Sequence, residues 1–475
     1  MSRLKLTLLI ACAVLTASLG LAAPVLASHN ETVYFEAPRD LLSSHTREAT
    51  FKTIDSLGVR AIRIVLYWKQ VALYPTRSHR PTFDATNPSN YLWGNYDAVI
   101  NEAHARGWSV LLTVSGPVPR WATAARRDNV TRPSAHEFGL FMTAVGRHYG
   151  SLVQTWSVWN EPNHPAFLDP QYVAGQPASP RIYRGLFQAA VAGLHTAGLT
   201  GAKVLMGETA PRGTGKDVAP LVFLRGALCL DSHYHRSSSC SALPADGYAH
   251  HAYTTLAGPT FVPPSRDDVT IGALSRLTRA VDLAYRAHAV PHPMNIYLTE
   301  FGIQSKPNPF YGVSLAQQAE FEETSERIAW DNPRVAAFSQ YLMRDDAQIS
   351  SPASGVPGAG FVGFQSGLRL ANGRDKPALS GFRLPLSASH SGGAVSLWGL
   401  VRPAHGVTTV DVLVIQPGSH RAHLLRRLTT DSLGHWALRT SYRNGRRWRV
   451  SWRSPAGTVF TGPPIRSYTS SGKVG

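Results

Sequence analysis

Long apolar runs are absent from this 475-residue chain except at its very start. The segment 1–27 begins with Arg3 and Lys5, continues through an apolar stretch and ends in Val25-Leu26-Ala27, which is the pattern of a secretory signal peptide. Its apolar core is short for a membrane span. The sequence therefore predicts a mature chain without a transmembrane segment, secreted or held at the extracellular surface.

Cysteine is rare, with three residues in the chain. Removal of the signal peptide would remove Cys12 and leave Cys229 and Cys240, an even pair in an oxidising compartment. The prediction is a disulfide that closes this short loop. A metal site is the alternative, because His233 and His235 lie between the two cysteines.

Acidic residues are few: 30 Asp and Glu stand against 47 Lys and Arg, for a formal net charge of +17. The segment 392–475 holds twelve Lys or Arg but only Asp411 and Asp431, so that end of the chain favours acidic partners. Its tryptophans, such as Trp448 and Trp452, fit a sandwich core better than a base-stacking stripe. For an exported protein we expect anionic cell-envelope polymers and no nucleic acid.

No Gly-x-Gly-x-x-Gly motif follows the first predicted strand, which argues against a dinucleotide-binding sheet. Instead, eight apolar segments of strand length alternate with helical segments, and after the first gap their starts are 40 to 49 residues apart. The strands begin near Thr32, Val59, Trp108, Gln154, Lys203, Asp246, Asn295 and Val335. The clearest helical patterns are Tyr96–Arg106, Ala135–Tyr149, Arg181–Ala197, Ile271–Ala287 and Leu315–Trp330. This alternation predicts a closed (β/α)8 TIM barrel over residues 28–386.

The pattern changes after the barrel. Residues 387–393, rich in Ser and Gly, are predicted to form a linker. Residues 394–475 contain short alternating strands separated by turn residues, which predicts a basic β-sandwich accessory domain. The expected fold class is therefore α/β, with a TIM barrel followed by a small C-terminal β-sandwich.

Glutamate is also scarce, and two of the twelve residues directly follow predicted strands. The fourth strand runs into Asn160-Glu161-Pro162 and the seventh into Thr299-Glu300. Each glutamate alone is compatible with an ordinary loop carboxylate. In a barrel, however, the strand ends meet at one mouth, and two opposed carboxylates there are the apparatus of glycoside hydrolysis. Glu208, after the fifth strand, is a third candidate.

Further polar and aromatic residues accompany these strand ends. Arg63 lies within the apolar second strand, so we expect it to be buried against a carboxylate. His251 and Tyr253 follow the apolar run of the sixth strand. Aromatic residues near strand ends are candidate sugar platforms, with core packing as the open alternative: Trp68, Trp93, Trp121 and Tyr311.

Together these motifs resemble the retaining glycoside hydrolases of the large TIM-barrel clan with catalytic glutamates on strands four and seven, which includes cellulase-like and xylosidase-like enzymes. The resemblance covers roughly Ser28 to Pro385. It implies that Glu161 is the acid/base and Glu300 the nucleophile, with carboxyl groups about 5 to 5.5 Å apart. The aromatic neighbours of Glu161 disfavour its charged form, as a general acid requires.

The same resemblance assigns roles to the neighbouring side chains. It implies that Asn160 holds the sugar 2-hydroxyl and that His251 lines the same subsite. Arg63 and Tyr253 would donate hydrogen bonds to Glu300 and keep it ionised. No metal or organic cofactor is required by this chemistry.

The eighth strand departs from the clan. Tyr341 or Arg344 stands where many members place a tryptophan under the reacting sugar, so the sugar is left open. Arg344 either recognises an acidic sugar or pairs with Asp345 or Asp346. The expected function is an exported retaining glycoside hydrolase with a carbohydrate substrate. A glycan-binding barrel without activity and a transglycosylase using the same site are the alternatives.

Overall fold

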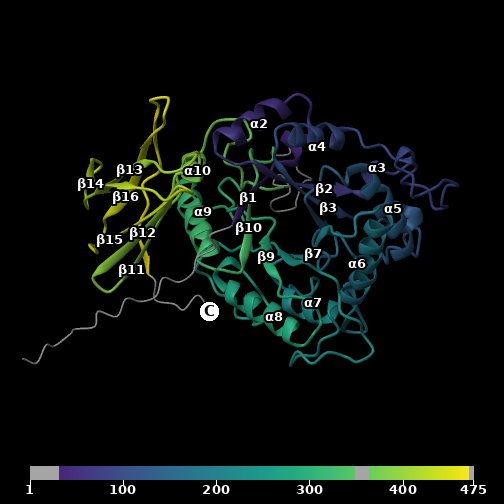
Figure 1. The fold of residues 1–475 in the computed structure, drawn as a ribbon. Coiled ribbons are helices and arrows are strands. Elements are labelled where there is room, and N and C mark those ends of the chain that lie inside the picture. Colours follow the sequence, from purple (N-terminus) through teal and green to yellow (C-terminus); the bar gives the residue numbers. More distant parts are fainter. Residues whose placement is uncertain (1–30, 348–362, 470–475) are drawn as a thin grey trace, which may run out of the picture.

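The computed structural model describes residues 31–347 and 363–469, which form a barrel with a β-sandwich beside it (Figure 1). The predicted signal peptide, 1–27, lies outside the described residues. Within the described ranges, every helix is too short or too polar to cross a bilayer.

The barrel confirms the predicted TIM architecture. Its strands form a closed parallel sheet in which each strand neighbours the next along the chain, and the last pairs with the first. The strands are β1 (Thr32–Glu36), β2 (Ala61–Tyr67), β3 (Ser109–Ser115), β4 (Thr155–Val158), β7 (Lys203–Thr209), β8 (Gly247–His250), β9 (Asn295–Leu298) and β10 (Val335–Tyr341).

Helices surround this sheet (Figure 1). They are α1 (Pro38–Leu42), α2 (Arg47–Ser56), α3 (Trp68–Val71), α4 (Asn95–Ala105), α5 (Ala135–Tyr149), α6 (Ser179–Thr196), α7 (Pro220–Ala227), α8 (Leu274–Arg286), α9 (Leu315–Trp330) and α10 (Pro377–Arg383). Short 3-10 turns and a small hairpin lie in the loops: η1 (Pro88–Asn90), η2 (Arg120–Ala122), η3 (Ile271–Ala273), β5 (Tyr172–Val173) and β6 (Gln176–Pro177). Two of the longer helices begin at serine caps. Ser134 accepts the backbone N–H of Glu137, and Ser314 forms a capping box with Gln317.

Alternation along the strands decides which side chains reach the barrel interior. In β2, Ile62, Ile64 and Leu66 pack outward against the helices. The other set, which includes Ala61 and Arg63, points inward. The interior is therefore apolar at the amino ends of the strands and polar towards the carboxyl ends, where a site can form.

The β-sandwich is confirmed as well. One sheet has the order β15-β12-β11-β18 and the other β14-β13-β16-β17. Their bounds are β11 (Leu386–Ser391), β12 (Ala394–Leu400), β13 (Thr409–Ile415), β14 (Ala422–Thr429), β15 (His435–Ser441), β16 (Arg447–Arg453), β17 (Val459–Thr461) and β18 (Tyr468–Thr469). Between the sheets lies a separate core that includes Trp436, Trp448 and Trp452.

The predicted linker, 387–393, is wrong. Most of it is strand β11, which pairs with β12 along its whole length. Leu386 and Ala388 are buried in the sandwich core, and only Gly392 and Gly393 form the hairpin turn between the two strands. Ser387, Ser389 and Ser391 thus belong to an inner strand, between β12 and β18, and a high content of Ser and Gly does not mark a linker here.

Buried contacts join the sandwich to the barrel. Arg402 of the sandwich donates to both carboxylate oxygens of Glu326 on α9 at 2.7 Å, and to the carbonyl oxygen of Phe382 on α10. Glu323 on α9 accepts the backbone N–H of Leu386 at 2.7 Å. Figure 1 shows α9 and α10 on the side of the barrel that faces the sandwich. The two domains are therefore packed against each other directly.

The structure pairs Cys229 with Cys240 as predicted, with Cα atoms 6.3 Å apart. His235, between them, pairs with Asp231. Among the described residues, no cluster of His, Cys, Asp and Glu has an arrangement that would hold a metal ion. The disulfide rather than the alternative metal site therefore accounts for both sulfurs.

Candidate active site

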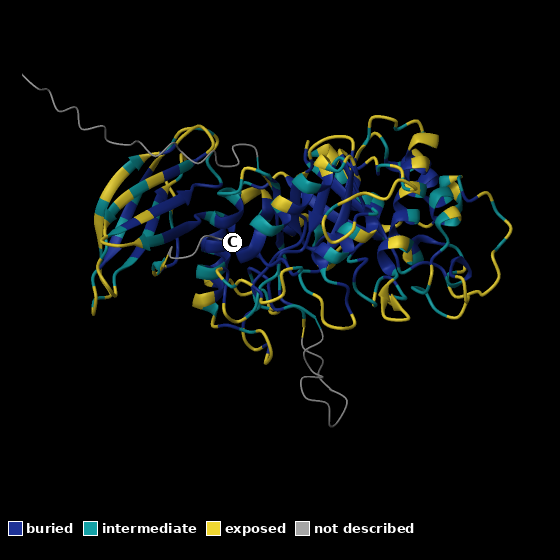
Figure 2. Ribbon diagram, turned by 90° about the horizontal axis from the view of Figure 1, so that it is seen from below, coloured by how far each residue is buried: buried dark blue, intermediate teal, exposed yellow. Residues whose placement is uncertain are grey.

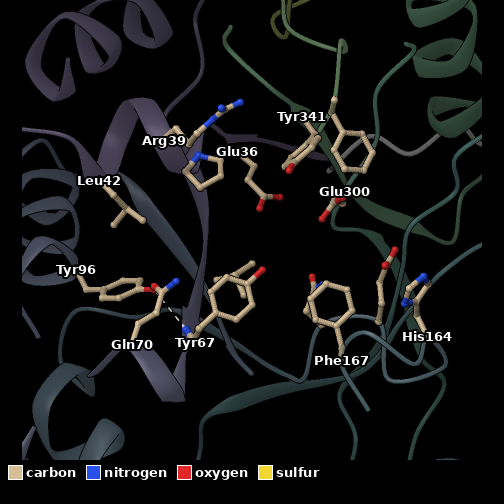
Figure 3. Close-up of a pocket in the computed structure, with 15 residues that line it drawn as sticks. Glu36, Arg39, Leu42, Tyr67, Gln70, Tyr96, His164, Phe167, Glu300 and Tyr341 are labelled. Atoms are coloured by element: carbon tan, nitrogen blue, oxygen red, sulfur yellow. Dashed lines mark hydrogen bonds between the residues drawn. The ribbon is translucent and has the colours of Figure 1, made fainter. Parts of the chain in front are cut away.

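A cavity of about 560 Å³ opens at the carboxyl ends of the barrel strands. Figure 3 shows Glu36 and Glu300 pointing into it from different strands, with Tyr341 and Tyr67 on its walls. Its lining comprises Glu36, Pro38, Arg39, Leu42, Val65, Tyr67, Gln70, Tyr96, Asn160, Glu161, His164, Phe167, Glu300, Tyr341 and Phe364. Both predicted catalytic glutamates thus line one hollow.

Arg63 is the cation at the base of this cavity. It is fully buried and forms ion pairs with three carboxylates, those of Glu36, Glu208 and Glu300. One Nη also donates to Asn160 Oδ1 at 2.8 Å. Burial alone would lower the pKa of Arg63, but these carboxylates raise it above its usual value, so the guanidinium stays charged and orients the groups around it.

Glu300 is held as an anion. Its Oε2 accepts from Arg63 at 3.0 Å and its Oε1 from the Tyr253 hydroxyl at 2.6 Å. Burial raises the pKa of Glu300, but the His251 and Arg63 charges and the Tyr253 hydrogen bond outweigh it, so the pKa lies below its usual value. A carboxylate so placed is ready to act as a nucleophile.

Glu161 faces Glu300 through a shared histidine. His251 Nδ1 lies 3.0 Å from Glu161 Oε1 and 3.8 Å from Glu300 Oε2. The two carboxylate oxygens are therefore no farther apart than the sum of these distances. Burial lowers the pKa of His251, but the two glutamates raise it above its ordinary value, so its protonated form is favoured between them.

The backbone at these strand ends adopts the left-handed region, which is unusual for residues with side chains. Trp159, Glu161 and Glu208 have φ values of 70°, 40° and 49°. The turn after β4 carries Glu161 towards the cavity, and its backbone N–H donates to the carbonyl oxygen of Glu208 at 3.0 Å. Such conformations persist where surrounding contacts fix them, and they cluster at functional sites.

Glu36 is a site residue that the sequence interpretation missed. It is the last residue of β1, lines the cavity and pairs with Arg63. Burial is the largest influence on its pKa and, despite Arg63, raises it to about 8. The strand-end rule that identified Glu161 and Glu300 applies to Glu36 equally, so the signal was present in Thr32–Glu36.

We predict that Glu36 makes stability depend on pH. Its pKa is about 8 in the fold against an ordinary value of 4.5, so between these values the folded state holds a proton that the unfolded chain has released. The contribution is fully present below about pH 4.5 and is lost as pH rises towards 8. Thermal melting from pH 4.5 to 8.5 should show Glu36→Gln gaining stability relative to wild type as pH rises.

Glu102→Gln, on the outer helix α4, is the matched control and should keep the wild-type pH dependence. A parallel pH dependence for Glu36→Gln and wild type would contradict the raised pKa of Glu36.

Glu208, the third candidate carboxylate, lies beneath the cavity rather than in its lining. It is fully buried and accepts from Arg63 and from the Thr113 hydroxyl, both at 2.7 Å. These contacts fix the guanidinium plane of Arg63 from below. Glu208 is therefore placed to position Arg63 and not to contact a substrate.

The structure corrects two of the predicted sugar-binding aromatics. Trp68 is fully buried and stacks on Phe141 at 4.9 Å, and Trp121 packs edge-on against Trp68. Neither lines the cavity, because both rings face the helices outside the barrel. Trp93 is likewise buried, stacked on His148. Core packing, the open alternative, holds for all three tryptophans.

The remaining predicted site residues lie partly inside and partly outside the cavity. Tyr341 lines the cavity as expected for its strand position, whereas Tyr311 is exposed and away from it. Arg344 pairs with Asp40 of α1, not with Asp345 or Asp346. Cavity residues without a strand-end signal were missed; they come from loops and helices and are Arg39, Gln70, Tyr96, His164, Phe167 and Phe364.

No protein-family model matches this sequence, and no curated protein matches it. The structure is similar to a family 39 glycoside hydrolase from the gut symbiont Bacteroides cellulosilyticus WH2, with a TM-score of 0.51, 14% identity and coverage of 88% of this chain and 80% of that one. It is also similar to the GH39 enzyme from Xanthomonas axonopodis pv. citri, with a TM-score of 0.50, 14% identity and coverage of 92% of this chain and 94% of that one. A glucosidase from Croceicoccus marinus is similar with a TM-score of 0.50, 12% identity and coverage of 89% of this chain and 95% of that one. The chain thus has the fold of TIM-barrel glycoside hydrolases, with a β-sandwich packed beside the barrel.

Proposed function

We propose that this protein is an exported retaining glycoside hydrolase that cleaves O-glycosidic bonds of a glycoside or of an oligo- or polysaccharide by double displacement. The observation that carries the proposal is the placement of Glu161 and Glu300 on one cavity, both within 4 Å of His251 Nδ1. Their separation is bounded by those contacts and is compatible with the spacing of retaining enzymes, about 5 to 5.5 Å.

In the first step, Glu300 attacks the anomeric carbon and the bond from that carbon to the leaving oxygen breaks. Glu161 gives its proton to that oxygen, so the leaving group departs as an alcohol. In the second step, Glu161 takes a proton from water, the resulting hydroxide attacks the anomeric carbon, and the bond to Glu300 breaks. Two inversions give net retention.

The environments of the two glutamates support this division of roles. Glu300 receives hydrogen bonds from Arg63 and Tyr253, which stabilise an anion. Among the contacts of the described residues, Glu161 has neither of these donors and contacts His251. Once Glu161 has given up its proton, its carboxylate accepts from the protonated ring of His251. The arrangement therefore supports Glu300 as nucleophile and Glu161 as acid/base.

The cavity walls supply hydrogen-bonding groups and apolar faces for a sugar. Asn160 is oriented by Arg63 and suits a sugar hydroxyl next to the anomeric carbon. The Glu36 carboxyl, whose pKa burial raises to about 8, and the hydroxyl of Tyr341 on the neighbouring strand β10 both reach the cavity and can donate hydrogen bonds to a sugar. Phe167 offers an apolar face. A carbohydrate fits this mixture better than a purely apolar ligand does.

The test is hydrolysis of a panel of aryl glycosides and polysaccharides by wild type and by Glu161→Ala. We expect kcat/KM of the variant to fall by about 10²–10⁴-fold for poor leaving groups. The loss should be small for dinitrophenyl glycosides, whose leaving group needs no proton. Azide should restore the variant and yield a glycosyl azide of retained configuration.

If the wild-type protein cleaves nothing in a broad panel, the hydrolase proposal fails and a glycan-binding barrel without activity is the alternative that remains. An equal loss for good and poor leaving groups would remove Glu161 from the acid role. Acceptor sugars added to a working reaction distinguish hydrolysis from transglycosylation by the products formed.

Export is proposed from the N-terminal sequence alone. The segment 1–27 has the charged start, apolar stretch and small-residue end of a signal peptide. Expression in a secreting host should yield extracellular protein whose first residue is Ser28. Intracellular protein with an intact N-terminus would contradict the assignment.

A further inference from the structure

A row of arginines lies on the outer face of strand β16. Trp448, Val450 and Trp452 are buried in the sandwich core, so alternation sends the other side chains outward. Arg447, Arg449 and Arg453 occupy these outward positions; neighbouring outward positions are spaced about 7 Å apart, and the row runs over about 20 Å. The strand thus presents a linear array of cations.

A polar pocket of about 380 Å³ lies at the Arg447 end of this row. It is formed where the turns β13–β14 and β15–β16 meet the segment before β18. Its lining comprises Gly418, Ser419, His420, Tyr442, Asn444, Gly445, Arg446, Arg447, Arg466 and Ser467. Three arginines and a histidine line it, and no carboxylate does. Arg447 belongs to both the pocket and the row, so the two features are continuous.

Neutral acceptors orient these arginines without cancelling their charge. Arg447 donates to the carbonyl oxygen of Ser419 at 3.0 Å, and Arg449 to that of Gly462 at 2.7 Å. The same holds for the others: Arg446 donates to the Gln416 side chain and Arg453 to the carbonyl oxygen of Gly457. Each guanidinium has five N–H groups, so donors remain for an incoming anion.

Two other sandwich arginines are paired with carboxylates. Arg427 is paired with Asp411, and Arg402 with Glu326. Within residues 31–347 and 363–469, no carboxylate forms an ion pair with Arg446, Arg447, Arg449 or Arg453. Among the described residues, the charges of these four arginines are therefore not balanced by an ion pair, and Arg447, Arg449 and Arg453 follow one strand.

We propose that this arginine track, defined as Arg446, Arg447, Arg449 and Arg453, binds an acidic polysaccharide. Guanidinium groups pair with carboxylates in a bidentate fashion, and a linear polymer with regularly spaced anionic groups matches a linear row. The choice of a glycan as the polymer rests on the proposed function. The binding itself needs only the track.

A glycan fits the track better than a nucleic acid does. Single-stranded nucleic acids bind through stacking of bases on exposed aromatic rings. On β16 the rings of Trp448 and Trp452 are buried, and Tyr442 of the pocket is stacked on His390 at 4.3 Å. The residues of the track therefore provide positive charge but no exposed aromatic ring on which a base could stack.

The track lies on the sheet that faces away from the barrel. Trp398 and His435 of the other sheet pack against Trp330 of α9. Figure 2 shows exposed strand segments at the end of the sandwich farthest from the barrel. A polymer bound there leaves the barrel cavity open, so the track can hold the protein on its target while the barrel acts.

The experiment measures binding of the full-length mature chain to polygalacturonate, with dextran as neutral polymer and a single-stranded oligonucleotide as a second polyanion. The test variant is Arg447→Gln/Arg449→Gln. The matched control is Arg426→Gln/Arg439→Gln, which removes the same charge from exposed sandwich positions outside the track. Thermal melting confirms that both variants fold.

We expect wild type to bind polygalacturonate and not dextran, and to bind the oligonucleotide more weakly. The test variant should lose about tenfold or more in affinity and the control less than about threefold. Equal losses in the two variants would show a diffuse charge effect and overturn the proposal, as would absence of polygalacturonate binding. Tighter binding of the oligonucleotide would make the track a nucleic-acid surface instead.

Failure of this proposal can be told apart from failure of the proposed function. Polymer binding is measured without turnover, and hydrolysis of small aryl glycosides is measured without the polymer. The test variant should hydrolyse small glycosides like wild type, because both substituted arginines are on the sandwich sheet that faces away from the barrel.

Discussion

Glu300→Gly is expected to lose glycoside hydrolysis by a factor on the order of 10⁵. The carboxylate of Glu300 lies in the cavity, is kept ionised by His251, Arg63 and Tyr253, and in the proposed mechanism forms the covalent bond to the sugar. Without it, no intermediate forms. Steady-state kinetics on an aryl glycoside that wild type cleaves measures the loss.

Azide makes this result specific to the nucleophile. The glycine leaves space for azide to attack the anomeric carbon directly, so Glu300→Gly should regain turnover with dinitrophenyl glycosides and give a glycosyl azide of inverted configuration. Wild type, treated with the same azide concentrations, should not change. A variant that keeps more than a small fraction of wild-type activity without azide would remove Glu300 from the nucleophile role.

Arg63→Met is expected to cost both stability and activity. Arg63 is the cation for Glu36, Glu208 and Glu300, and removal of one partner from buried pairs costs about 3–5 kcal/mol. The pKa values of Glu36 and Glu300, which Arg63 lowers, should rise. The loss of stability should then be smaller at acid pH, where they are protonated, and larger as pH rises. Chemical denaturation at several pH values measures this.

Activity separates the catalytic contribution of Arg63 from its structural one. kcat/KM of Arg63→Met should fall by at least about 10²-fold, because Glu300 loses a donor that holds it ionised. The double variant Arg63→Met/Glu208→Gln removes one orphaned charge, so it should recover stability but not activity. Arg106→Met, which breaks partly exposed pairs, is the control and should cost within about 1 kcal/mol. Wild-type stability in Arg63→Met would contradict the charge network.

Much of the barrel was predictable because its signals are local and repeated. The predicted helices Ala135–Tyr149 and Leu315–Trp330 coincide with α5 and α9, since apolar periodicity and serine caps mark both. Strand spacing gave the closed barrel, and strand ends gave Glu161 and Glu300. A parallel barrel brings strand ends to one mouth whatever their separation in sequence, so residues far apart in the chain could be placed together.

The sequence did not predict features that depend on the orientation of a side chain or on a contact with a residue far away in the chain. Trp68 follows β2 immediately, yet the first turn of α3 directs its ring into the core against Phe141, which no local pattern reveals. Arg344 finds its partner at Asp40, on the other side of the barrel closure. In both cases the tertiary fold, not the neighbouring sequence, decides what the side chain contacts.

The prediction of a linker between the two domains was wrong for a different reason. The content of Ser and Gly predicts a flexible segment at 387–393, but Leu386 and Ala388, two positions apart, are both buried in the sandwich core. Ser387 and Ser389 point to the other face of the sheet, where Ser387 is buried as well. Period-two alternation was therefore the better guide here than the content of Ser and Gly.

The central claim is that Glu161 and Glu300 act on one sugar from the same cavity, with Glu300 forming the covalent bond. Incubation with a panel of activated 2-deoxy-2-fluoro glycosides, followed by mass spectrometry of proteolytic peptides, tests it most directly. We predict one sugar adduct per chain, on the peptide that contains Glu300. An adduct on Glu161, Glu36 or Glu208 instead, or a wild-type reaction that releases sugar of inverted configuration, would contradict the account.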